Sequence, residues 1–148
     1  MTTLLIETLY DQLEQEFTLS NEERYSIGCI SPYLYMHNAP AGTFTLSIIS
    51  GATTVFSQSF TSNDIKTATY LTDDYAHVFF PIVPVNPLQL DAGTYKIRLS
   101  ASGYTATGSF MGWIRQHEYL NNIITYTPEA DDHNPLAFRI KVYKRGTS

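Results

Sequence analysis

The sequence has few charged residues, a single cysteine and no long apolar run. Charged residues make up 16% of the 148 positions and the net charge is −5, so the chain lacks the concentrated Lys and Arg that displace counterions from nucleic-acid phosphates. One cysteine, Cys29, rules out a disulfide within the chain. Its apolar neighbours predict a small core residue. No stretch reaches the roughly 18 apolar residues of a membrane-spanning helix. We therefore expect no nucleic-acid partner and no membrane partner.

The motifs of common catalytic and cofactor sites are also missing. The chain contains no G-x-S-x-G nucleophile turn, no Gly-rich phosphate loop and no dinucleotide-binding G-x-G-x-x-G. His117 and Glu118 begin like a zinc-protease helix, but Asn121 occupies the position of the second histidine. The acidic groups at 73–74 and 129–132 lack the spacing of a calcium loop, which leaves solvated turns as the favoured interpretation. We predict no catalytic residue, no metal and no cofactor.

Hydrophobic residues make up 43% of the chain, which is enough to bury one core. Their main period is two. In residues 94–101, Tyr95, Ile97 and Leu99 share one face, while Thr, Lys, Arg and Ser take the other. This alternation is typical of antiparallel strands with one solvated side. Residues 43–49 and 138–143 alternate in the same way, and weaker candidates are 16–19, 25–36, 54–61, 76–85 and 110–117.

Turn residues separate these runs. Asn, Pro and Gly at 38–42 and Asp and Gly at 91–93 fall between alternating segments. Three prolines at 81, 84 and 87 interrupt one apolar run, so that strand is broken or lies at an edge. Residues 62–68 could form one helical turn with Ser62 as the N-cap. We predict an all-β fold, an antiparallel β-sandwich of the jelly-roll type with about eight strands and at most one short helix.

The N-terminal segment, residues 1–15, is predicted to be an arm that precedes a single domain at 16–148. Its apolar residues fit either a helical stripe or a strand, and we favour an extended arm. The arm either packs on its own domain or reaches a neighbouring copy, and we favour the second. Leu5, Leu9 and Leu13 would then be buried in the interface, with the acidic residues of the arm facing Lys141, Lys144 and Arg145.

Aromatic residues are numerous, with 11 tyrosines, 8 phenylalanines and one tryptophan. Tyr33 and Tyr35 follow a proline, and Tyr104, Trp113 and Tyr119 lie near turns or strand ends. Tyr and Trp have flat apolar faces with a polar edge, which suits a sugar ring or a protein interface. Core packing is the alternative, and for Trp113 it is the favoured one. We take Tyr104, Trp113 and Tyr119 as the candidate ligand-binding residues.

Four motifs follow one another in a familiar order: EFTLS (16–20), PAGT (40–43), PLQLDAGTY (87–95) and GWI (112–114). This succession resembles jelly-roll domains of the carbohydrate-binding-module type, which also occur in tailed-phage virion proteins. The resemblance covers residues 15–145 and rests on turn chemistry that many jelly rolls share. It implies sugar binding through exposed aromatics and a structural calcium, although the acidic pattern of a calcium site is not evident here.

The first 16 residues contain no Lys or Arg and only a short apolar stretch, so we expect no secretory signal. A virion protein made in host cytoplasm and released by lysis needs none. Our first hypothesis is therefore a non-enzymatic virion accessory subunit, such as a head-decoration, tail or fibre protein. Its partners would be other virion proteins and copies of itself, with adhesion to a surface glycan as a further role. The alternative is a free-standing carbohydrate-binding module that uses exposed aromatics.

Overall fold

The computed structural model describes residues 2–5, 12–70, 72–104, 108–115, 124–127 and 138–144. Side chains are described for 12–19, 25–70, 72–104 and 108–114. Within these ranges the chain forms nine strands and one helix: β1 (Thr2–Leu5), β2 (Gln12–His37), β3 (Thr43–Ser50), β4 (Thr53–Phe60), α1 (Ser62–Ala68), β5 (Ala76–Phe79), β6 (Leu88–Ser102), β7 (Phe110–Arg115), β8 (Ile124–Thr127) and β9 (Phe138–Lys144). All strand pairs are antiparallel. The predicted all-β antiparallel sandwich with one short helix is confirmed.

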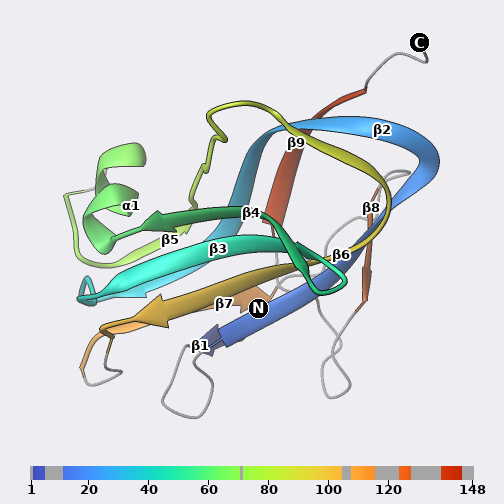
Figure 1. The fold of residues 1–148 in the computed structure, drawn as a ribbon. Helices are drawn as coiled ribbons and strands as arrows, with labels where there is room; N and C mark the ends of the chain where they lie inside the picture. The colour runs from blue at the N-terminus through green and yellow to red at the C-terminus, as the bar shows by residue number, and fades with distance from the viewer. Residues whose placement is uncertain are drawn as a thin grey trace.

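The strand β2 belongs to both sheets of the sandwich. Figure 1 shows it as the long blue strand that curves from one sheet into the other. Its last residues lie between β5 and β7, and β7 pairs with β1. This is the four-stranded sheet, β5-β2-β7-β1. The earlier part of β2 pairs with β6, which continues through β3 to β4, while β8 and β9 pair along the other side of β2. We call this second group the larger sheet.

Two irregularities in the pairing of β2, of equal size and on opposite strands, allow this long strand to bend. The bridge Ile30–Ile82 is followed by the pair Ile27–Leu88, so the segment between β5 and β6, which contains the prolines, has three more residues than the part of β2 opposite it. Between the pairs Arg24–Asp91 and Leu19–Gly93, β2 gains three residues in return. Extra residues on one strand bend it and increase its twist. Pro81, Pro84 and Pro87 break the strand predicted at 76–85, as expected: β5 ends at Phe79 and the next strand, β6, begins at Leu88.

One hydrophobic core lies between the two sheets. Of the residues that alternate in 94–101, Tyr95, Ile97 and Leu99 are buried as predicted. The core also contains Leu13, Phe17, Leu34, Met36, Phe44, Leu46, Met111 and Trp113. Phe138, Ile140 and Val142 lie in β9, whose side chains are outside the described residues. Cys29 is half-buried instead of a core residue, because the register with β9 shifts between Ile27 and Cys29.

The helix α1 forms where it is predicted, but its N-cap is Thr61 and not Ser62. The Thr61 hydroxyl accepts a hydrogen bond from the Asp64 backbone N–H, and the Asp64 carboxylate accepts one from the Thr61 N–H. This reciprocal pair is a capping box. Within the described residues α1 is the only helix, and it is too short to cross a membrane.

The prediction of a separate N-terminal arm is wrong for the described part of residues 1–15. Thr2–Leu5 is a strand that pairs with β7, which places Leu4 opposite Trp113. Leu13 lies in β2, pairs with Leu99 of β6 and is 2% exposed. It therefore packs in the core of its own domain and not against a neighbouring copy. Leu9 lies outside the described residues. The extended conformation that we favoured is present, but it continues the sandwich.

Candidate functional site

The outer face of the four-stranded sheet is covered with aromatic and imidazole rings. In β2 the odd-numbered residues Tyr33, Tyr35 and His37 point away from the core, because Leu34 and Met36 are buried on the other side. Strand pairing places three further rings opposite them, and Tyr75 lies just before β5. We call this surface the aromatic face; it consists of Tyr33, Tyr35, His37, Tyr75, His77, Phe79 and Phe110.

Each ring of the aromatic face contacts at least one other ring. Tyr33 stacks on Phe79, with ring centroids 4.3 Å apart and planes 7° from parallel. The next cross-strand pair is Tyr35 with His77, at 5.0 Å. At the far end His37 lies 4.9 Å from Tyr75 in an edge-on arrangement and 5.9 Å from Phe110. Cross-strand aromatic pairs of this kind stabilise a sheet while leaving the outer faces of their rings available.

Polar atoms lie at the edges of these rings. The Tyr35 hydroxyl and His37 Nδ1 are 3.1 Å apart and form a hydrogen bond. Tyr75 is 54% exposed and His77 is also exposed, while the other rings are half-buried. Gly112 stands opposite Tyr35 on β7 and has no side chain to cover the tyrosine. The face therefore combines flat apolar surface with hydroxyl and imidazole groups that can donate or accept hydrogen bonds.

A strained loop and α1 hold the end of the aromatic face that carries His37 and Tyr75. Asn38 and Ala39 follow His37 with φ of 56° and 33°, a backbone region that non-glycine residues seldom adopt. The Ala39 N–H donates a hydrogen bond to the Asp74 carbonyl, at 2.9 Å. This bond joins the segment that follows His37 to the residue that precedes Tyr75.

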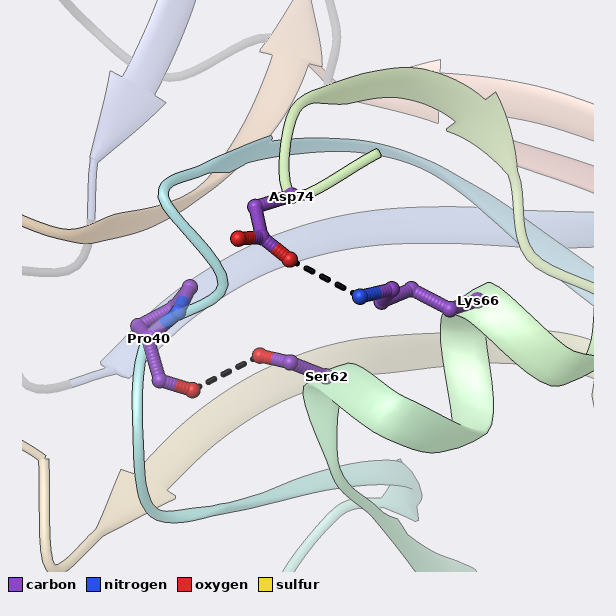
Figure 2. Close-up of polar contacts among 4 residues, drawn as sticks. All are labelled: Pro40, Ser62, Lys66 and Asp74. Atoms are coloured by element: carbon purple, nitrogen blue, oxygen red, sulfur yellow. Dashed lines mark hydrogen bonds and ion pairs between the residues drawn. The ribbon is translucent and has the colours of Figure 1, made fainter. Parts of the chain in front are cut away.

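The helix α1 contacts both of these segments, as Figure 2 shows. The buried Ser62 hydroxyl donates to the Pro40 carbonyl at 2.7 Å, and the Lys66 ammonium contacts the Asp74 carboxylate at 2.8 Å. Asp74, one of the predicted turn carboxylates, is thus paired with a cation. These two contacts and the Ala39–Asp74 hydrogen bond hold the segments next to His37 and Tyr75, so α1 supports the aromatic face without being part of it.

The outer face of the larger sheet has a different chemistry. Glu14 pairs with Arg98 at 2.6 Å, and hydroxyls pair across strands at 3.0 Å in Thr18–Thr94 and Thr45–Ser59. Nearby, Tyr95 donates its hydroxyl to the Asp91 carbonyl, and burial, followed by the Asp91 charge, raises the pKa of this phenol. The phenol therefore stays protonated, and its hydrogen bond holds Tyr95 to the backbone at Asp91. The two outer faces differ, and the aromatic one is the candidate site.

The predicted ligand-binding residues do not form a site in the described structure. Trp113 is 0% exposed and belongs to the core, so its role as an exposed stacking residue is wrong and the core alternative is confirmed. Tyr104 is half-buried; its ring lies edge-on to Phe44, and its hydroxyl accepts a hydrogen bond from the Met111 N–H. Tyr119 lies outside the described residues.

Of the predicted interface residues, Leu5, Lys141 and Lys144 lie in β1 and β9, where only the backbone is described. Arg145 lies outside the described residues. Within the described ranges, no three His, Cys, Asp or Glu side chains come together as a metal site would need.

The sequence pattern singled out Tyr33 and Tyr35 but missed His37, Tyr75, His77, Phe79 and Phe110. The available signal was the alternation Tyr33-x-Tyr35-x-His37 in a strand whose other face holds Leu34 and Met36. Comparison with protein-family models, with curated proteins and with solved structures found no match, so the aromatic face itself carries the functional inference.

Proposed function

We propose that the protein is a non-enzymatic binding protein that holds carbohydrate on its aromatic face. The observation that supports this is the presence of seven rings on one outer sheet surface: Tyr33 and Phe79 form a stacked pair, and the other five contact one another around Tyr35 and His37. Rings that only filled the core would point inward, as Trp113 does. Rings kept on the outer side of a sheet expose apolar area that a ligand can cover.

Sugar rings suit this surface because they have both apolar and polar sides. The C–H groups of a pyranose lie against an aromatic plane, while its hydroxyls reach donors and acceptors at the edge of the ring. The Tyr35 hydroxyl and the two imidazoles supply such groups next to the apolar planes. Because the described rings are spread along three neighbouring strands of the sheet, they fit an extended saccharide chain or a glycan-coated surface.

We propose as the biological setting an accessory subunit of a tailed-phage virion, with this glycan adhesion as one of its roles. The resemblance of the four sequence motifs to jelly-roll modules found in virions supports this setting. The alternative is a free-standing carbohydrate-binding module with the same face. Mass spectrometry of purified particles distinguishes the two: a virion subunit is present at stoichiometric copy number, and its absence from particles would leave the free-standing module.

A glycan array tests the carbohydrate proposal directly. The Tyr35→Ala and Tyr75→Ala variants should each bind the recognised glycan at least about tenfold more weakly, a loss of about 1.4 kcal/mol. Tyr70→Ala is the matched control, because Tyr70 is 94% exposed and lies outside the face. Thermal unfolding confirms that each variant is folded. Equal binding by the folded Tyr35→Ala and Tyr75→Ala proteins, or no binding to any glycan by the original protein, contradicts the proposal.

A further inference from the structure

The strand β4 is an open edge of the larger sheet. Among the described strands it pairs only with β3, and it ends the strand order of the sheet, as Figure 1 shows. Edge strands usually carry a charge or a proline that prevents pairing with another chain. Residues 53–60 contain neither, and Ser57, Gln58 and Ser59 are exposed. A bulge leaves Val55 without a partner on β3, so the regular part of the edge is Phe56–Phe60.

The regular part of this edge is a palindrome, Phe-Ser-Gln-Ser-Phe. If it pairs antiparallel with a second copy about Gln58, Phe56 lies opposite Phe60, Ser57 opposite Ser59 and Gln58 opposite itself. Aromatic pairs and hydroxyl pairs across strands are favourable, and no like charges meet. The sheet already contains the same hydroxyl contact between Thr45 and Ser59, at 3.0 Å. A glutamine amide both donates and accepts, so two of them on a symmetry axis can satisfy each other.

A groove with both polar and apolar lining residues lies beside the same residues. It has a volume of about 350 Å³ and is lined on one side by Gln58 and Phe60 and on the other by the segment that contains the prolines. In that segment Val83 and Val85 are 66% and 97% exposed, an unusual position for aliphatic side chains. A strand added next to β4 would direct every second side chain towards this groove. In the palindromic register that side chain, opposite Phe60, is Phe56 of the second copy.

We propose that β4 is a homodimerisation edge at which two copies pair antiparallel about Gln58. Each copy inserts Phe56 beside the groove of the other, where Val83 and Val85 cover it. The larger sheets of the two copies then join into one sheet. This interface is independent of the aromatic face, so its test does not depend on the carbohydrate proposal.

Charge reversal on the symmetry axis tests the proposed dimer. The original protein should be a dimer in analytical ultracentrifugation between about 1 µM and 1 mM. Gln58→Glu and Gln58→Lys each place two like charges opposite one another and should weaken dimerisation at least about tenfold. An equimolar mixture of the two variants should recover a heterodimer, which a merely misfolded variant would not do. Gln89→Glu, the same change in an exposed glutamine of β6, is the control and should leave the dimer intact.

Cross-linking tests the register. In a Cys29→Ser background, Gln58→Cys should form a disulfide between copies, because directly opposite Cα atoms lie about 5 Å apart and a disulfide spans that distance. Thr54→Cys, on the same strand, should not, since the two copies of residue 54 would be roughly 26 Å apart along the strands. Cross-linking by both variants alike contradicts the register, and a dimer that survives both charge changes contradicts the edge. If the original protein is a monomer at every concentration, β4 does not pair with a second copy, and the proposal is overturned.

Discussion

At the scale of single residues, Gly42 is the position where backbone conformation and packing together exclude any side chain. Its φ is 115°, and a Cβ atom there would meet the carbonyl oxygens of Ser102 and Gly103 at 2.9 Å. Two turns approach each other at this point, where Thr43 begins its pairing with Ser102. Gly51 also has a positive φ, 62°, but a Cβ atom there would meet nothing within 4 Å. The two glycines separate the cost of the conformation from the cost of the contact.

We predict that Gly42→Ala destabilises the protein more than Gly51→Ala does. The left-handed conformation alone should cost Gly51→Ala about 1–2 kcal/mol, and the steric overlap should cost Gly42→Ala about 1–3 kcal/mol more. Urea denaturation of both variants measures the difference in the free energy of unfolding. Equal losses would show that the turn at Gly103 moves aside without strain.

The residue scale also shows why the candidate site could be predicted only in part. Alternation in β7 places Met111 and Trp113 on one face and Phe110 and Gly112 on the other, but it does not say which face is buried. The pairing of Trp113 with Leu34 decides this, and that pairing joins residues far apart in the sequence. The sequence alone indicates that Tyr33 and Tyr35 are aromatics beyond those that fill the inward positions of the core strands. Their cross-strand partners His77 and Phe79 follow only from the register.

At the scale of elements, β2 is longer than the sequence pattern predicts. The alternation supports strands at 16–19 and 25–36, because the polar residues 20–23 interrupt it. The backbone nevertheless continues as one strand, since the extra residues form a bulge against β6. β8 was not predicted at all, because its four residues are too few to show a period. Bulges and short strands are stabilised by their partners, which a single segment does not reveal.

We predict that the first part of β2 is essential to the fold. Deleting residues 1–15 removes β1, the buried Leu13 and the Glu14–Arg98 ion pair. Loss of the Leu13 side chain alone should cost about 2–5 kcal/mol, so the truncated protein should melt at a much lower temperature or fail to fold. Glu14→Gln is the control and should cost less than about 1 kcal/mol, because this ion pair is partly exposed. If the truncated protein has an unchanged melting temperature, residues 1–15 are a separate arm after all.

At the scale of the whole molecule, the aromatic face and the β4 edge lie on different sheets of the sandwich. An antiparallel edge pair has its two-fold axis perpendicular to the joined sheet. Both four-stranded sheets then lie on the same side of that sheet, since the core of each copy lies between its own two sheets. Their aromatic faces look in the same direction. A dimer built in this way could hold one glycan-coated surface at two points.

This geometry predicts that dimerisation strengthens attachment to surfaces but not the binding of a single saccharide. Gln58→Glu should bind a soluble oligosaccharide, chosen from the array, as tightly as the original protein, because the aromatic face is unchanged. On a surface densely coated with the same glycan, its retention should fall by roughly 100-fold, the usual range for loss of a second linked site. Surface plasmon resonance at low and high glycan density measures both quantities, with Gln89→Glu as the control. If Gln58→Glu is retained equally at high density, the two faces do not engage one surface together, and the arrangement inferred for the dimer is wrong even if each copy binds glycan.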